Sequence, residues 1–510
     1  MTPAARRFSV LFLCLLSLAT AMRLQVAFRQ VTTPLEYDYG EGIVLFQTSH
    51  ITDLHVAYRN IDTPPYVVFH YPPVYYLLVR LTDRFVGNPL VSGRLTSVLC
   101  TLGVLLLIGS LVYRVIPARW GRGDRFIFAA IAFCLPLQLE AMTWAGFMRV
   151  DMAALLFSYA GLVIFILGGE RLLPQVVSVV LFVVALYTRQ TTIAAALACL
   201  AAAAIVSLRR AAALSLFGAA LTVSLGAAGN ALTSGGFVTN LIGYNVNPFS
   251  MMRAARGFAQ CFYSLGLVLP LALVIVWFQI AKFCRFRLRD SLIRLRANLA
   301  HVSMRRALVV LSIHFALTLV TVGAYGKLGS NCNYFLDFQI CACVLAAFLL
   351  FTLYARPESS ARLLSRSYGL APTIAISFGL ALGALLLAVR TELVFRGMET
   401  QARIGHAQRV VGEIRAAGGP VWSDNMTLLA QAGRDVVAEP AIVSVLARSG
   451  RWNESGLIRM LRERRLALIV AHMDLDSDDF YSPGVRQAIR ESYGLDKRIG
   501  EYSLYRPRAR

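Results

Sequence analysis

Charged residues are scarce in this chain, and acidic residues are the scarcest. Of its 510 residues only 15% are charged, 28 acidic against 50 basic, whereas 57% are hydrophobic and the mean hydropathy is +0.61. Soluble globular domains of ordinary composition are less apolar than this, so that class is excluded. The net charge of +22 does not indicate a nucleic-acid partner, because the arginines fall mainly in short loops between apolar runs and in the tail.

Patterns typical of disulfide-bonded or zinc-binding proteins are also missing. Nine cysteines are present, but all except Cys332 lie in or at the edge of apolar runs, where cysteine behaves as a small hydrophobic residue. Cys332 falls in a predicted outer loop, and no cysteine follows Arg396. The spacing therefore predicts neither a disulfide framework nor a zinc site.

Long apolar runs are what the sequence has in abundance. A helix needs roughly 20 mostly apolar residues to cross about 30 Å of hydrocarbon, and on this basis we predict a mostly α, polytopic membrane bundle of about 11 transmembrane helices, two of them short. The first run follows Arg6-Arg7 like a signal peptide but stays apolar to Phe28, so we expect an uncleaved helix. The predicted spans are 8–28, 90–112, 125–139, 150–167, 174–187, 191–208, 211–232, 261–281, 307–324, 334–354 and 370–389.

Basic residues sort the loops between these helices into two sets. If the N-terminus lies inside, the inner loops carry most of the lysine and arginine and the outer loops carry little, as the positive-inside rule requires. The inner-loop basic residues are then Arg114, Arg119, Arg122, Arg125, Arg171, Arg209, Arg210, Lys282, Arg285, Arg287, Arg289, Arg294, Arg296, Arg305, Arg306, Arg356, Arg362 and Arg366. We therefore predict an N-inside, C-outside topology.

The pattern changes after Arg390, where short polar segments replace the apolar runs. We predict helices at 392–415, 425–432, 454–464 and 485–493 and strands at 421–423, 466–471 and 502–505. Strands and helices that alternate at this length are typical of a small α/β domain. We therefore divide the chain into a transmembrane module, residues 1–391, and a small extracytoplasmic α/β domain, residues 392–510.

The predicted topology places five polar stretches together on the outer side. They are the first loop, residues 29–89, and residues 140–151, 188–190, 230–256 and 326–334. Polar groups that converge at one end of a bundle are typical of a binding site, so we expect one outward-facing site made by several loops.

The first loop has the most unusual composition of the five. Residues 36–42 read Glu-Tyr-Asp-Tyr-Gly-Glu-Gly, and residues 70–76 read His-Tyr-Pro-Pro-Val-Tyr-Tyr. Carboxylates so close together beside a bilayer are costly unless they are used or well solvated. The simplest alternative is a solvated loop with a helix that starts at Pro72-Pro73.

The acidic motif, the Tyr-Pro-Pro-x-Tyr-Tyr turn and Gly93-Arg94-Leu95 at the start of a long apolar helix resemble membrane glycosyltransferases of the GT-C type. The similarity is greatest to the family of protein O-mannosyltransferases and the lipid A aminoarabinose transferase, which is glycosyltransferase family 39-like. The resemblance implies inverting transfer of a sugar from a polyprenyl-phosphate donor to an acceptor hydroxyl. It also implies a bacterial inner membrane, with the site on the extracytoplasmic side, and a lipid, glycan or protein acceptor.

Inverting transfer needs a base that takes the acceptor proton. Asp38 occupies the position of the acidic residue that begins the first-loop motif of the resembled family, and Glu41 is the second catalytic candidate. That family usually has an Asp-Glu pair, whereas Tyr39-Gly40 separates the two carboxylates here. The choice between them stays open, with Glu36 as a third candidate.

The departing phosphate needs positive charge. Arg149, Arg189 and Lys327 lie in outer stretches and are the candidate contacts to the donor phosphate. Asp151 would hold Arg149 toward the site, unless the two form only an ion pair at a helix start. Arg189 follows a small polar residue, as the resembled family tends to show, and Lys327 lies in a glycine-containing loop where backbone N–H groups can approach an anion. Each of these side chains could instead extend to the membrane interface.

A divalent metal would be a second source of this positive charge, and no cofactor is otherwise expected. His50, His55 and His70 are the candidate ligands, although their spacing matches no compact ligand motif. A loop histidine is more often simply solvated.

Polar and aromatic side chains of the outer loops could also line a groove for the sugar or the lipid. The candidates are Tyr71, Tyr75 and Asn333. The two tyrosines fit an aromatic belt at the membrane interface equally well.

Two other functions remain open at this stage. A transporter or flippase of a lipid-linked saccharide would place charge at mid-membrane on broken helices, often in repeated halves. Here the charges lie in outer loops and no halves repeat. A non-enzymatic assembly scaffold would leave the acidic first loop unexplained.

Overall fold

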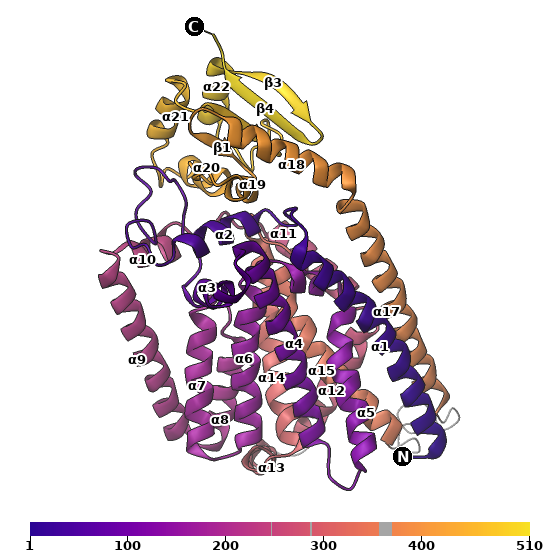
Figure 1. Cartoon of the computed structure of the whole chain (residues 1–510). Helices are drawn as coiled ribbons and strands as arrows, with labels where there is room; N and C mark the ends of the chain where they lie inside the picture. Colours follow the sequence, from indigo (N-terminus) through magenta and orange to yellow (C-terminus); the bar gives the residue numbers. More distant parts are fainter. Residues whose placement is uncertain (246, 286–287, 356–369, 510) are drawn as a thin grey trace.

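The computed structural model describes residues 1–245, 247–285, 288–355 and 370–509. In these ranges the chain is a bundle of helices with a small α/β domain at one end, and its two termini lie at opposite ends of the molecule (Figure 1). The mostly helical architecture and the small C-terminal sheet confirm these parts of the predicted fold class. The predicted inner-loop residues Arg287, Arg356, Arg362 and Arg366 lie outside the described ranges.

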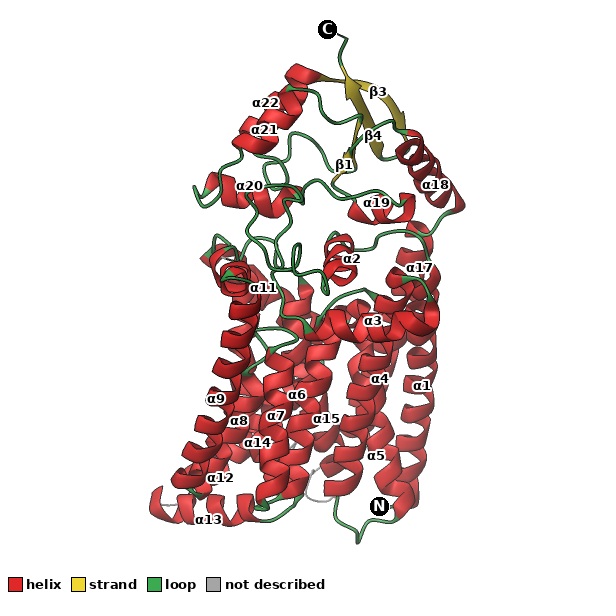
Figure 2. Ribbon diagram, turned by 60° about the vertical axis from the view of Figure 1, so that its left-hand side comes forward, coloured by secondary structure: helices red, strands yellow, loops and turns green. Residues whose placement is uncertain are grey.

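Apolar helices that run from one end of the bundle to the other form its body (Figures 1 and 2). By length and composition, 7 helices of the described ranges can cross a membrane, or up to 9 if each of two bent pairs is one span. The seven helices are α1 (Pro3–Thr32), α4 (Pro89–Val115), α6 (Asp151–Gly168), α9 (Leu208–Leu232), α14 (Met304–Gly323), α15 (Leu336–Ala355) and α17 (Ala371–Met398). The shorter apolar helices are α7 (Leu172–Leu186) and α8 (Ala194–Val206). Each predicted segment therefore contains apolar helix, and the number of spans stays a prediction.

The two bent pairs differ from the straight spans that the sequence predicts. Helix α5 (Arg122–Cys134) continues into η1 (Leu135–Gln138), and η2 (Glu140–Gly146) then turns by 89°. Helix α11 (Met251–Leu265) meets α12 (Val268–Cys284) at 95°. The predicted span 261–281 therefore starts only at Val268, because Gly266, with φ +50 and ψ −126, has a backbone conformation that favours glycine and ends α11.

The first loop is partly helical and lies across one end of the spans, beneath the C-terminal domain (Figure 2). It contains α2 (Gly40–His50) and α3 (Val74–Val86). Gly87, in the left-handed conformation with φ +70, ends α3, and the Asn88 side chain caps α4. This sharp turn places α3 directly against the first turns of α4.

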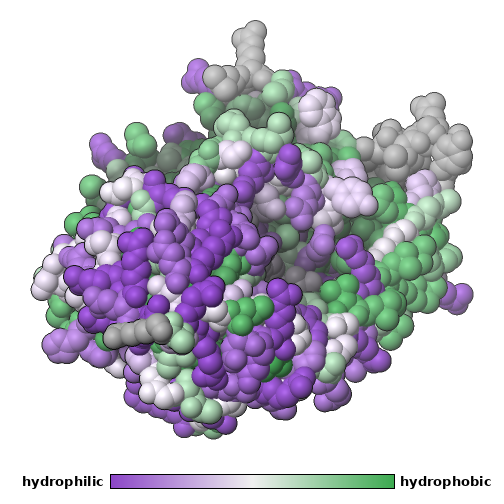
Figure 3. All heavy atoms as spheres, turned by 90° about the horizontal axis from the view of Figure 1, so that it is seen from above, coloured by the Kyte–Doolittle hydropathy of each residue, from purple (hydrophilic) through white to green (hydrophobic). Residues whose placement is uncertain are grey.

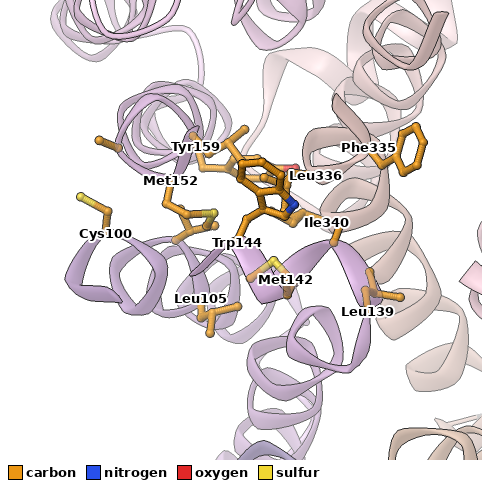
Figure 4. Packing of buried hydrophobic residues seen from close by; sticks show 14 of the residues in the cluster. Cys100, Leu105, Leu139, Met142, Trp144, Met152, Tyr159, Phe335, Leu336 and Ile340 are labelled. Carbon is orange, nitrogen blue, oxygen red and sulfur yellow. The ribbon is translucent and has the colours of Figure 1, made fainter. Parts of the chain in front are cut away.

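Short elements fill the remaining connections of the bundle. They are α10 (Gly236–Val238), η3 (Thr239–Gly243), α13 (Leu288–Ala300), η4 (Ala324–Gly326) and η5 (Cys332–Phe335). The segment η2 carries Trp144 into a cluster of buried side chains from α4, α6 and α15 (Figure 4). This packing fixes the loop that leads to Arg149, one of the predicted phosphate contacts.

The C-terminal domain contains a four-stranded sheet of order β1-β2-β4-β3. Strands β1 and β2 are parallel, and the other two pairs are antiparallel. The strands are β1 (Val421–Ser423), β2 (Leu468–Ala471), β3 (Tyr493–Ile499) and β4 (Tyr502–Pro507). The helices are α18 (Gln401–Ala416), α19 (Met426–Ala432), α20 (Pro440–Arg448), α21 (Ser455–Arg462) and α22 (Pro483–Ser492).

Candidate active site

Asp38 lies in the short segment that joins α1 to α2, at the end of the bundle that faces the C-terminal domain. Its Oδ2 atom accepts a hydrogen bond from Nη1 of Arg149 at 3.0 Å and another from the Gly40 backbone N–H at 3.0 Å. Arg149 comes from the loop between η2 and α6, more than a hundred residues away in the sequence. Two of the predicted site residues are therefore in direct contact.

Gly40 permits this contact because it has no side chain. A Cβ atom at this position would lie 1.3 Å from Nη1 of Arg149 and 2.9 Å from Oδ2 of Asp38. Any larger residue would push the guanidinium group away from the carboxylate. The glycine between the two carboxylates of the motif thus has a steric role in the site.

Asp151 joins a second arginine to the same cluster. Its Oδ1 atom accepts a short hydrogen bond from Nη1 of Arg189 and one of 3.0 Å from the side-chain amide of Asn333. The Nε atom of Arg149 lies 4.0 Å from Oδ2 of Asp151. Asp151 therefore holds Arg189 more directly than Arg149, and three separate stretches of the chain, residues 149–151, 189 and 333, meet at one buried carboxylate.

Aromatic rings cover both arginines. The Arg149 guanidinium lies 5.3 Å from the ring centre of Trp144 and 6.0 Å from that of Tyr71, and its Nη2 donates to the Tyr71 hydroxyl at 3.3 Å. The Arg189 guanidinium lies 4.6 Å from the ring centre of Tyr334. Such cation–π contacts hold a guanidinium in place while its N–H edges stay available to an anion.

Glu41 is placed quite differently from Asp38. Its side chain and that of Arg94 are both 0% exposed, and Nε and Nη2 of Arg94 bind its two oxygens at 2.8 and 2.7 Å. The backbone N–H groups of Met148 and Tyr37 also donate to Glu41, at 2.8 and 2.9 Å. Every acceptor position of this carboxylate is thereby occupied. This is expected of a structural ion pair, whereas a general base needs a free oxygen that can accept a proton.

Neighbouring charge separates Asp38 from the third carboxylate, Glu36. Burial raises the pKa of Asp38 above its ordinary value, and the nearby Arg149 partly opposes this shift. Burial raises the pKa of Glu36 much further, with Glu41, Asp38 and Asp424 of the C-terminal domain adding to the rise. Glu36 is therefore poorly suited to work as an ionised base near neutral pH.

Among the described residues, Lys327 and Tyr75 make no direct side-chain contact with Asp38, Arg149, Asp151 or Arg189. The Lys327 backbone bridges to Phe249, and within the described ranges its half-buried ammonium group has no ion-pair partner. Tyr75 is buried between α3 and α4, where its hydroxyl donates to the Gly93 carbonyl at 2.9 Å. Lys327 is thus a cation without an ion-pair partner in the part of the chain that the structure describes, while Tyr75 has a place in the packing of the first loop.

The three candidate metal ligands are not brought together. His50 contacts the Phe46 carbonyl through Nδ1 at 2.9 Å, His55 is exposed, and His70 lies 3.4 Å from the Gln47 amide. Burial and the nearby Arg149 lower the pKa of His70 to about 4. In the part of the chain that the structure describes, no group of three histidine, cysteine or carboxylate residues is placed to hold a metal ion.

Three contributors to the site were not predicted as such. Trp144 and Tyr334 cover the arginines, and Arg94 neutralises Glu41. Arg94 had a signal of its own, because an arginine in the first turns of an apolar span is rare unless it pairs with an acidic residue. The two aromatic residues have no comparable signal, because aromatic rings are common at membrane interfaces.

The molecule is hydrophilic and hollowed at the end where these residues lie. Seen from above, the surface over the C-terminal domain is mostly hydrophilic, and a hollow opens beside it (Figure 3).

Solved structures with this architecture are known, although no protein-family model and no curated protein matches the sequence. ArnT from Cupriavidus metallidurans bound to undecaprenyl phosphate aligns with a TM-score of 0.55 and 15% identity, over 96% of this chain and 97% of that chain. The oligosaccharyltransferase AglB from Archaeoglobus fulgidus, in complex with an inhibitory peptide and a dolichol-phosphate, aligns with a TM-score of 0.51 and 11% identity, over 98% and 74%.

The similarity to ArnT extends over nearly the whole of both chains, so it includes the bundle and the C-terminal domain. The shared architecture confirms the resemblance that the first-loop motif indicated, at the level of the fold. This chain shares its fold with ArnT and with the archaeal oligosaccharyltransferase.

Proposed function

We propose that this protein is an inverting glycosyltransferase that moves a sugar from a polyprenyl-phosphate donor to an acceptor hydroxyl at the extracytoplasmic face of a bacterial inner membrane. The observation that carries the proposal is the buried cluster of Asp38, Arg149, Asp151 and Arg189, in which carboxylates and guanidinium groups alternate. A base beside two arginines is what displacement of a lipid phosphate requires. The solved neighbours ArnT and AglB hold an undecaprenyl phosphate and a dolichol-phosphate.

Asp38 takes the role of general base in this mechanism. Its carboxylate accepts the proton of the acceptor hydroxyl while the hydroxyl oxygen bonds to the anomeric carbon of the sugar. The bond between that carbon and the phosphate oxygen breaks in the same step, and polyprenyl phosphate leaves with the electron pair. A single displacement inverts the configuration at the anomeric carbon.

Arg149 and Arg189 take the role of phosphate contacts. Charge builds up on the phosphate as it departs, and two guanidinium groups held by Asp151 are positioned to stabilise that charge. Arg149 also pairs with Asp38 at 3.0 Å, and an adjacent cation weakens a carboxylate base. A donor phosphate that competes for Arg149 therefore makes Asp38 more basic just when the donor is bound.

The other predicted site residues take supporting roles. Lys327 is the third cation for the donor. Tyr71 and Asn333 contact Arg149 and Asp151, and they line the sugar or lipid groove next to the phosphate. Tyr75 is not assigned to the groove, because its hydroxyl is used within the packing of the first loop. The acceptor is a lipid, a glycan or a protein.

A donor-consumption assay tests the function without knowledge of the acceptor. Membranes containing the wild-type chain or the Asp38→Asn variant are given a panel of radiolabelled undecaprenyl-phosphate hexoses and pentoses, and the release of undecaprenyl phosphate is measured. The wild type should consume at least one donor and label an endogenous acceptor. Donor that crosses the membrane unchanged would instead identify a transporter or flippase.

Arg189→Ala and Lys327→Ala should weaken use of the donor while the protein stays folded and inserted. Charge-assisted contacts are worth roughly 1.5–3 kcal/mol each, so we expect losses of about 10- to 100-fold in kcat/KM for the donor. Arg253→Ala, an outer-side arginine on α11, is the matched control. Normal donor kinetics in both variants would show that neither residue contacts the donor phosphate.

Cysteine labelling tests the sidedness of the proposal. In a background where Cys14, Cys284 and Cys332 are replaced by serine, Arg289→Cys on α13 should react only from the cytoplasm. Asp479→Cys in the C-terminal domain should react only from outside. Labelling of the Arg289→Cys site from outside would put the base on the wrong side for the proposed reaction.

A further inference from the structure

The segment that carries Asp38 is held on both sides by tyrosines. Tyr37 and Tyr39 flank the carboxylate, and in the folded chain their hydroxyl groups go to two different partners. Neither tyrosine hydroxyl touches Arg149 or Asp151 among the contacts of the described residues. Both partners are carboxylates that come from beyond residue 391, in or next to the C-terminal domain.

Tyr37 points to the end of α17, the helix that leads into the C-terminal domain. Its hydroxyl donates to Oε1 of Glu399 at 2.5 Å, and Oε2 of Glu399 accepts from Arg29 of α1 at 2.6 Å. The Tyr37 ring also stacks on Phe147, with ring centres 5.7 Å apart and planes inclined by 9°. One side of the Asp38 segment is therefore fixed to the end of α17.

Tyr39 points into the C-terminal domain itself. Its hydroxyl makes a short hydrogen bond to Glu439, and its ring packs edge-on against Phe480 with centres 4.9 Å apart. Glu439 is only 1% exposed and rigidly held, because it also caps α20 through the backbone N–H groups of Ala441 and Ile442, at 3.0 and 2.8 Å. The other side of the segment is thus fixed to the domain.

The chain on either side of these tyrosines touches the domain as well. The side-chain amide of Gln431 donates to the Pro34 carbonyl at 2.6 Å. At Gly42 a Cβ atom would lie 3.0 Å from the Cβ of Met426, so the first turn of α2 packs directly on α19. Contacts with α19 therefore hold the chain on both sides of the two tyrosines.

We propose that the C-terminal domain acts as a clamp on the catalytic segment, with Tyr37 and Tyr39 as positioning residues that hold Asp38 against Arg149. This inference rests on the proposed function, because it assigns the domain a part in the chemistry of that site. Two hydroxyl–carboxylate bonds on opposite sides of one residue restrict the swing of its backbone. Misplacement of a catalytic group by about 1 Å can lower the rate about 100-fold. Loss of the clamp should therefore reduce turnover strongly.

The test compares Tyr37→Phe and Tyr39→Phe with Tyr66→Phe, each in the full-length chain. The two test variants remove only the hydroxyl that reaches Glu399 at the end of α17 or Glu439 of the domain, and they keep the ring. Tyr66 lies in the same interface, packs on Trp452 at 5.2 Å, and its hydroxyl has no hydrogen-bond partner among the described residues. It is therefore a control for the loss of a tyrosine hydroxyl at this interface.

We expect hydrogen–deuterium exchange of residues 36–42 to be several-fold faster in Tyr39→Phe, with a smaller effect in Tyr37→Phe and none in Tyr66→Phe. In the donor-consumption assay kcat should fall about 10- to 100-fold while KM for the donor stays unchanged. A merely structural role would lower the amount of folded protein and leave kcat per folded molecule intact.

Two outcomes would overturn the clamp. One is exchange of residues 36–42 in both test variants that equals the Tyr66→Phe control. The other is faster exchange with unchanged kcat, which would show that the contacts hold the loop without serving the reaction. If the wild type consumes no donor, the proposed function fails instead, and the exchange measurement alone decides whether the domain holds this segment.

Discussion

Arg94→Met should destabilise this protein more than any other single substitution in the first loop and its supporting helices. The variant leaves the Glu41 carboxylate buried without its cation, and breaking a buried ion pair in this way costs about 3–5 kcal/mol. Arg94 also donates to the carbonyls of Gln30, Thr33 and Leu35, at 2.9, 2.6 and 2.7 Å, so the link between α1 and α2 loses three further contacts. Thermal unfolding in detergent, followed by tryptophan fluorescence, measures the effect.

Arg80→Met is the matched control for this change. Arg80 is an exposed arginine on α3 whose Nη1 donates to the Ser49 carbonyl at 3.2 Å, so its loss should move the unfolding temperature little. The double variant Glu41→Gln, Arg94→Met should recover part of the lost stability, because no charge is then left unpaired. Equal unfolding temperatures for Arg94→Met and Arg80→Met would refute a structural role for the Glu41–Arg94 pair.

The spans were predictable from the sequence because the thickness of the hydrocarbon core requires a long, mostly apolar run of residues. A single polar residue does not obscure a run of that length. The bends were not, because they depend on local backbone conformation. The sequence does not distinguish Gly266 from any other glycine of an apolar run, yet its positive φ lets the chain turn by 95° between α11 and α12. Strand β3 and helix α20 were also missed, since β3 is mostly exposed and carries Asp-Lys-Arg in its middle, and α20 lies between turn residues.

The candidate site was predictable as a set of loops but not as a set of contacts. The positive-inside pattern led us to expect Asp38, Arg149, Arg189 and Asn333 on one side, and the structure places all four around Asp151 or its partners. Their pairing could not be predicted, because each comes from a different connection and only packing sets the distances. The roles of the two motif carboxylates depended on Arg94, which lies 53 positions from Glu41 in the sequence.

Asp38→Asn should reduce turnover by about two to four orders of magnitude, the range for the loss of a general base. Asparagine keeps the size and hydrogen bonding of the side chain but cannot take a proton. Donor affinity should persist, because the phosphate contacts are the arginines, and the unfolding temperature should change little. The donor-consumption assay and a binding measurement with undecaprenyl phosphate separate the two effects.

The pH dependence of the wild type provides an independent check on Asp38. Its carboxylate must be ionised to act, and burial raises its pKa, so turnover should fall as the pH drops through a value above the ordinary range for aspartate. Glu41→Gln is the decisive comparison, because it should lower stability together with activity, whereas Asp38→Asn should lower activity alone. If Asp38→Asn turns over normally and Glu41→Gln is inactive but fully stable, then Glu41 is the base and its contact with Arg94 must open during the reaction.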